Sequence, residues 1–124
     1  MTSEAVFVVD DDPSVRRALD RLLRSAGYQV RTFASAYEVL AEMHAGRPAC
    51  LVVDVRMPGC TGLDLVELLR KAPDPPAVIF ITGHGDIAMA VRAMKAGAVD
   101  FLAKPFDDVA LLDAVAQAMR KVER

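Results

Sequence analysis

Three uninterrupted apolar segments constrain this chain more than any other feature. They lie at Ala5–Val9, Ala49–Val53 and Ala77–Ile81, and each is bounded by polar residues or helix breakers. Because they do not alternate with polar residues, we expect both faces of each segment to be buried, which is typical of central strands in a parallel sheet. Two weaker segments complete the set, namely Tyr28–Phe33, which alternates as an edge strand does, and Val99–Ala103.

Helical patterns separate these five segments. Asp12 is suited to cap the first helix and Gly27 to end it, whereas Ser35 with Glu38 predicts a capping box before the second. The other helices are indicated by apolar residues at helical spacing: Leu65, Val66 and Leu69 in the third, Ala90, Val91 and Met94 in the fourth, and Leu111, Val115 and Met119 in the fifth. Strand and helix therefore alternate five times, which predicts one α/β domain with a parallel sheet between two layers of helices.

Composition excludes several classes of protein. The 124 residues fit one domain, 53% of them are hydrophobic, and the formal net charge is −2. This balance argues against disorder and against a basic surface for nucleic acid or membranes, and no apolar run approaches the ~20 residues of a membrane span. The first residues lack a basic stretch, and Cys50 and Cys60 have no metal or redox spacing. We therefore expect a reduced, cytoplasmic protein without a signal peptide.

Reactive side chains follow four of the five predicted strands. The carboxyl ends of parallel strands meet at one edge of a sheet, where ligands of such folds bind, so these side chains are expected to meet there. They are Asp10, Asp11 and Asp12 after the first strand, Asp54 after the third, Thr82 after the fourth and Lys104 after the fifth.

This combination predicts phosphoryl chemistry. Converging carboxylates need a counter-charge, and oxygen ligands without His or Cys suit Mg²⁺. A carboxylate beside Mg²⁺ can attack phosphorus and form an aspartyl phosphate, whose oxygens Lys104 and Thr82 are placed to hold. Each residue alone has an ordinary structural interpretation, and for Asp12 a helix cap is favoured over a metal ligand. The prediction depends on their common position at one edge.

At these positions the sequence resembles the receiver domain of two-component response regulators, over about residues 4–120. The details are most similar to FixJ-type receivers, with NtrC-type receivers second. The segments that carry the resemblance are Val8-Val9-Asp10-Asp11-Asp12, Asp54-Val55-Arg56-Met57-Pro58-Gly59, Thr82-Gly83-His84-Gly85-Asp86 and Lys104-Pro105-Phe106.

The resemblance implies a flavodoxin-like (CheY-like) doubly wound sheet with strand order 2-1-3-4-5 and five helices. It also implies a role for each matching residue. Asp54 is the implied phosphoacceptor. The implied Mg²⁺ ligands are Asp11, which binds directly, Asp10, which acts partly through water, and the backbone carbonyl of Arg56. Lys104, followed by a cis Lys104–Pro105 bond, is implied to pair with the phosphoryl group, and Thr82 and Phe101 are the implied switch residues.

The partners are implied in the same way. A sensor histidine kinase would supply the phosphoryl group, and phosphorylation would produce a homodimer through the fourth helix and fifth strand, where Val91 and Lys95 lie one turn apart. The function is then a switch in transcription regulation, with slow autodephosphorylation as the only turnover. We expect one receiver domain at residues 1–124 without an output domain, so that this domain itself does not bind DNA. A stand-alone receiver that acts by binding another protein is an open alternative.

One segment departs from the family pattern. Cys60-Thr61-Gly62 stands where the family usually has an apolar residue, then Asp or Asn, then Gly. Thr61 can still make a local hydrogen bond, so we expect any effect on the rigidity of this loop and not on the chemistry. Arg56 and His84 each lie two residues beyond a site residue, where they border the phosphoryl group and are expected to tune its lifetime.

Two other functions share part of this residue pattern. A phosphatase of the haloacid dehalogenase type needs a second Asp two residues after its nucleophile, but Arg56 holds that position and cannot cycle a proton at neutral pH. Gly83–Ala88 matches the dinucleotide pattern G-x-G-x-x-A, but only one strand remains after it to build the binding half. Both functions are therefore disfavoured.

Overall fold

The structure is a computed structural model, and it describes residues 5–43, 48–57, 59–71, 75–83 and 87–122. The strands are β1 (Val6–Val9), β2 (Val30–Phe33), β3 (Cys50–Asp54), β4 (Ala77–Thr82) and β5 (Asp100–Ala103). The helices are α1 (Pro13–Ser25), α2 (Ala36–Glu42), α3 (Gly62–Arg70), α4 (Ile87–Lys95) and α5 (Asp108–Val122).

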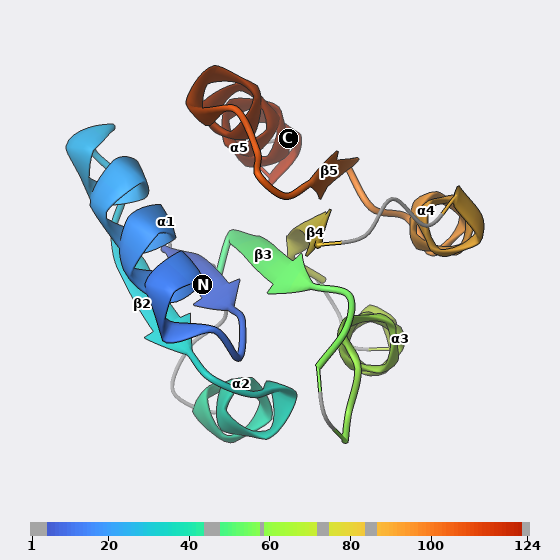
Figure 1. Cartoon of the computed structure of the whole chain (residues 1–124). Coiled ribbons are helices and arrows are strands. Elements are labelled where there is room, and N and C mark those ends of the chain that lie inside the picture. The colour runs from blue at the N-terminus through green and yellow to red at the C-terminus, as the bar shows by residue number, and fades with distance from the viewer. Residues whose placement is uncertain (1–4, 44–47, 58, 72–74, 84–86, 123–124) are drawn as a thin grey trace.

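The five strands form one parallel sheet in the order β2-β1-β3-β4-β5. Every strand is followed by a helix, and the helices lie on both faces of the sheet (Figure 1). This is the CheY-like flavodoxin fold that the resemblance implied. Its strand order reverses between β1 and β3, which brings the ends of these two neighbouring strands to one point of the carboxyl edge.

Two hydrophobic cores cover the two faces of the sheet. Leu19, Leu23, Leu111 and Val115 bring α1 and α5 against one face. The other face is packed by residues of α2 and α3 together with Ala93 of α4. All residues of β1 and β3 are buried, as continuous apolarity predicted for central strands.

The edge strand differs from its prediction. It begins at Val30 instead of Tyr28, and strict alternation is wrong because Arg31 and Thr32 are both exposed. Val30 and Phe33 are buried at its two ends and join the cores on opposite faces of the sheet. Tyr28 belongs to the turn after α1, since its N–H donates to the carbonyl of Leu23.

The predicted caps hold the first two helices. The Asp12 carboxylate accepts a hydrogen bond from the N–H of Ser14, and the Ser35 hydroxyl accepts from the N–H of Glu38. The Glu38 carboxylate binds the N–H of Ala34, one residue earlier than a capping box requires. Asp86 and His84 lie outside the described residues. No helix in the described part of the chain is long and apolar enough to cross a membrane.

Candidate functional site

Asp10 is the centre of the carboxyl edge, and its backbone and side chain are both fixed. It is fully buried directly after β1. Its N–H donates to the carbonyl of Phe33 at 3.1 Å, and its own carbonyl accepts from the Arg16 guanidinium at 2.7 Å. One carboxylate oxygen accepts from the N–H of Asp12 at 2.9 Å. The position of this carboxylate is therefore set by hydrogen bonds from several sides.

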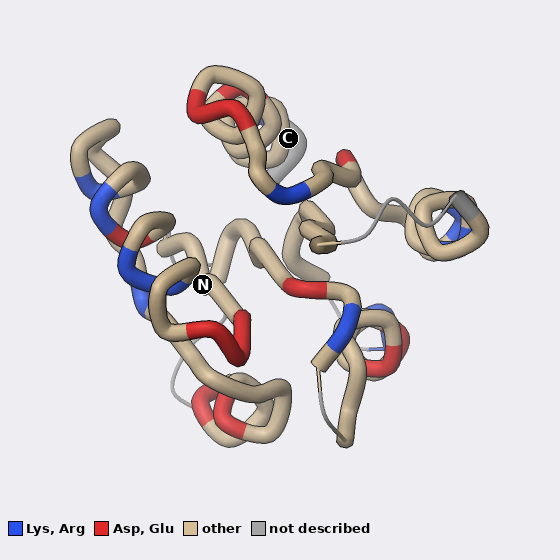
Figure 2. The backbone as a smooth tube through the Cα atoms, in the orientation of Figure 1, with Lys and Arg blue, Asp and Glu red and all other residues tan. Residues whose placement is uncertain are grey.

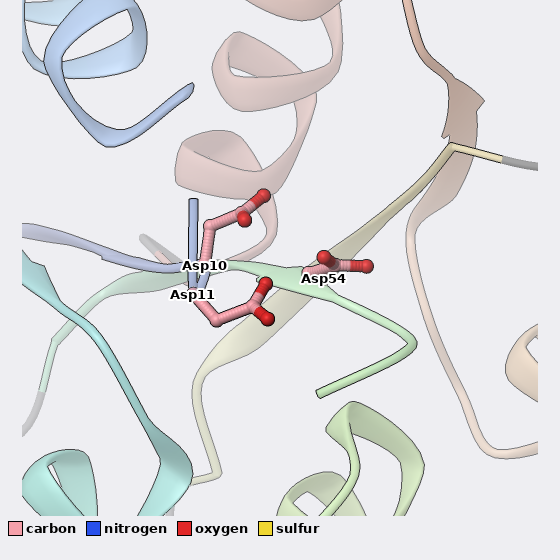
Figure 3. Close-up of side chains that lie close together, drawn as sticks. All are labelled: Asp10, Asp11 and Asp54. Carbon is pink, nitrogen blue, oxygen red and sulfur yellow. The ribbon is translucent and has the colours of Figure 1, made fainter. Parts of the chain in front are cut away.

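Three carboxylates meet at this point. Asp10 and exposed Asp11 come from the end of β1, and buried Asp54 is the last residue of β3. Figure 3 shows the three side chains close together, and one oxygen of each lies within 4.8 Å of the others. Asp12 caps α1 beside them and is outside this group, as the sequence favoured.

The environment of Asp54 opposes its ionisation. Burial raises the pKa of this carboxyl above its usual range, and the negative charge of Asp10 acts in the same direction. The N–H of Arg56, which donates to one oxygen of Asp54 at 3.1 Å, and the ammonium of Lys104 lower the pKa but do not offset burial. A further positive charge beside Asp54 would therefore favour its ionised form.

Lys104 supplies the cation of the site. Its ammonium donates to Asp10 at 2.8 Å and to Asp54 at 3.3 Å, and these partners lie 94 and 50 residues earlier in the chain. Figure 2 shows the acidic segments after β1 and at the end of β3, with a basic segment after β5. Burial lowers the pKa of Lys104, but the hydrogen bond to Asp10 and the charges of Asp54 and Asp10 outweigh burial and raise it. The Lys104–Pro105 bond is cis, as implied.

The donor atoms fit a hard divalent cation. The cluster offers carboxylate oxygens only, from Asp10, Asp11 and Asp54, and such ligands suit Mg²⁺. Lys104 contacts two of these acids, Asp10 and Asp54, and one ammonium cannot balance three carboxylates. Burial, with a smaller contribution from the charge of Asp10, raises the pKa of Asp54, and a cation bound beside this carboxylate would offset that cost.

The two residues that the resemblance implies as switches lie where the sheet continues from this cluster. Thr82 ends β4 and is buried, and its carbonyl accepts from the N–H of Lys104 at 2.7 Å. Phe101 in β5 is partly buried and packs against the core beneath α2, α3 and α4. Arg56 is exposed beside Asp54. Thr82 and Lys104 are therefore directly connected through their backbones.

Two local supports of the site go beyond what the sequence predicted. Arg16 anchors the Asp10 carbonyl from one turn into α1, and nothing in its spacing marks it for this contact. Thr61 caps α3 and forms a reciprocal capping box with Asp64, a pattern the sequence contains. Cys60 is half-buried, and burial followed by the charge of Asp64 raises the pKa of its thiol. That direction disfavours a reactive thiolate.

The face formed by α4 and β5 has a different character. Val91 and Met94 are 46% and 48% exposed, and an open groove on α4 is lined by Ala90, Val91, Met94 and Lys95. The two residues that the sequence placed on this face, Val91 and Lys95, are therefore both accessible.

An α/β sheet of this order, with an acidic cluster and a lysine at its carboxyl edge, defines a class of signalling domain. The family described as "Response regulator receiver domain" matches residues 6–116. The chain belongs to this family, as its motifs predicted. Members are in general not classical enzymes, and receiver domains interact with sensor histidine kinases.

Within the family, the chain is FixJ-like. It is 53% identical to Nodulation protein W of Bradyrhizobium diazoefficiens over 120 residues, which cover 97% of this chain and 53% of that protein. It is 50% identical to the transcriptional regulatory protein FixJ of Azorhizobium caulinodans over 113 residues, or 89% and 52% of the two chains. The solved structure of FixJ-N superposes with a TM-score of 0.87 at 42% identity, covering 97% of this chain and 96% of that one. The chain spans about half the length of the curated relatives it matches.

Proposed function

We propose that Asp54 is the phosphoacceptor of this receiver domain and that a sensor histidine kinase supplies the phosphoryl group from phosphohistidine. A carboxylate oxygen of Asp54 attacks phosphorus in line. The O–P bond forms while the P–N bond breaks, and the electron pair of that bond leaves with the imidazole. The observation that carries the proposal is the position of Asp54, which ends β3 beside the two acids that follow β1 and within reach of Lys104.

Asp11, Asp54 and the backbone carbonyl of Arg56 would hold Mg²⁺, with Asp10 contributing partly through water. The ion, when bound, offsets the negative charge that the phosphoryl oxygens bring to the site. Lys104 then exchanges its longer hydrogen bond, to Asp54, for one to a phosphoryl oxygen, while it keeps the shorter bond to Asp10. The Thr82 hydroxyl turns toward the same oxygens. Together these groups hold an added charge of about −1.5 to −2.

The response is proposed to reach the face formed by α4 and β5. Movement of Thr82 and Phe101 shifts a balance between two packings of this region. The shifted face, with Val91 and Lys95, pairs with a second copy of the chain and so controls transcription. Residues 1–124 act here as one receiver domain that does not itself contact nucleic acid, in keeping with its net charge of −2. Turnover is limited to self-phosphorylation and slow autodephosphorylation.

Phosphorylation by acetyl phosphate and Mg²⁺, followed by intact mass, tests this function. Wild type and Asp12→Asn should gain one phosphoryl group, because Asp12 only caps α1. Asp54→Asn should gain none. Full phosphorylation of Asp54→Asn would show that the assignment is wrong, and turnover of p-nitrophenyl phosphate would favour a phosphatase instead.

A further inference from the structure

Gly62, the first residue of α3, lies directly behind the proposed phosphoacceptor. It is buried, and a Cβ built on it would fall against the carbonyl oxygen of Asp54. The same Cβ would lie 3.0 Å from the Asp54 carbonyl carbon and 3.1 Å from the Cα of Val55. Carbon atoms in contact normally lie about 3.5–4.0 Å apart. All three neighbours are backbone atoms, so no side-chain rotation can relieve the contact.

The backbone in front of Gly62 is held on two sides. The N–H of Val55 donates to the carbonyl of Ile81 in β4 at 3.0 Å, and the carbonyl of Val55 accepts from the N–H of Gly62 at 3.1 Å. The next N–H, that of Arg56, donates to the Asp54 carboxylate at 3.1 Å. The Asp54 peptide is therefore confined between β4 and the first turn of α3.

The helix behind it is fixed as well. The side chain of Thr61 caps the N–H of Asp64, and the Asp64 carboxylate accepts from the N–H of Thr61, both at 3.2 Å. Leu63 and Leu65 anchor the same turn in the core. Gly27 and Gly97 differ, because they have nothing within 4 Å of a built Cβ and serve a left-handed backbone instead, and a Cβ on Gly59 would meet only side-chain atoms, those of Tyr37.

We propose that Gly62 is a positioning residue for phosphoryl transfer: its missing side chain lets α3 press against the Asp54 backbone and fixes where the carboxylate stands relative to Lys104 and the metal ligands. The inference rests on the proposed role of Asp54. A Cβ at position 62 displaces the Asp54 peptide by about 0.5–1 Å while the sheet, held by its own core, still folds.

The test is the maximal rate of phosphorylation at saturating acetyl phosphate and Mg²⁺, measured by intact mass on the whole chain. A shift of this size is expected to lower the rate of Gly62→Ala roughly 10- to 100-fold. Leu69→Ala is the matched control, because it empties a buried site in the same helix away from Asp54. It should lose stability but keep its maximal rate. Far-UV circular dichroism verifies that both variants are folded at the temperature used, with trimethylamine N-oxide added where needed.

The maximal rate of Gly62→Ser should fall as far as that of Gly62→Ala, because the Cβ atom alone already makes the contact. An unchanged maximal rate in folded Gly62→Ala overturns the inference. A Gly62→Ala chain that stays unfolded with the osmolyte also overturns it, because Gly62 would then be required for folding rather than for positioning Asp54. Asp54→Asn, run in parallel, separates this from the proposed function: if it is phosphorylated, the acceptor is wrong regardless of Gly62.

Discussion

Asp10 and Val91 belong to two regions that are built in opposite ways. Asp10 has no exposed surface and hydrogen bonds on its N–H, its carbonyl and both carboxylate oxygens, whereas Val91 is 46% exposed on α4. Of the described side chains in α4, only Ala93 is buried, while α3 buries Leu63, Leu65, Val66 and Leu69. A helix with so small a buried contact can be displaced at a low cost in free energy.

The difference fits the proposed division between phosphoryl transfer at the strand ends and a switch at α4. Phosphoryl transfer needs acids and a lysine held to within fractions of an ångström, which strand ends and a dense hydrogen-bond network provide. A switch needs an element whose two positions differ little in free energy, and α4 with its accessible apolar face fits that need. Substitutions in one region should therefore leave the properties of the other largely unchanged.

The largest effect is expected from Asp11→Ala, which removes an exposed carboxylate from the rigid region. Mg²⁺ affinity should fall at least about 10-fold, because the loss of outer-shell partners alone commonly costs about 10- to 100-fold. Isothermal titration calorimetry measures it. Asp12→Ala is the control: it removes the cap on Ser14 and should cost about 1 kcal/mol of stability with little change in Mg²⁺ affinity. If both variants bind Mg²⁺ normally, this edge is not the metal site.

A second prediction addresses the loosely packed region. With beryllofluoride as a phosphoryl mimic, the wild type should pass from monomer to dimer, and Val91→Glu should stay monomeric. The charge enters a two-fold interface twice, so its effect is doubled. Sedimentation velocity measures the state, and intact mass should show normal phosphorylation of Asp54.

The matched control for that experiment is Val109→Glu, which places the same charge at an exposed valine of α5. It should dimerise normally. A wild-type chain that is monomeric with and without beryllofluoride would argue for a stand-alone receiver that acts by binding another protein.

The sequence predicted the rigid region well because its site residues follow directly on the apolar segments that mark the strands. Uninterrupted apolar segments identified β1, β3 and β4, and a parallel sheet then necessarily gathers Asp10, Asp54 and the lysine after β5 at one edge. The start of the edge strand was wrong, because a turn residue such as Tyr28 carries the same apolar character as a strand residue.

Contacts between elements could not be predicted in the same way. The bond from Arg16 to the Asp10 carbonyl depends on how α1 crosses the sheet, and no residue pattern encodes that angle. The close approach of Gly62 to Asp54 likewise depends on the packing of α3. Lys104 was expected to face the phosphoryl group, but its shorter bond to Asp10 follows from side-chain geometry that spacing does not contain.

The smallest effect is expected from Asp54→Asn on stability, measured in EDTA by urea unfolding across pH. Burial raises the pKa of Asp54 in the folded state, whereas an unfolded aspartate has a pKa of about 3.9. Below the unfolded pKa both states are protonated and no penalty exists. Above the raised pKa the folded state must keep a buried carboxylate, which lowers the free energy of unfolding.

Asn can still accept from the N–H of Arg56, and Lys104 retains its shorter bond to Asp10. Asp54→Asn should therefore be more stable than wild type at pH 7, with a gain that shrinks as the pH falls toward 4. Asp12→Asn makes the same substitution at the exposed cap of α1 and serves as the control. A loss of stability at pH 7 would mean that the ion pair with Lys104 outweighs the cost of burial. The charge of Asp54 would then stabilise the folded state at this edge instead of destabilising it.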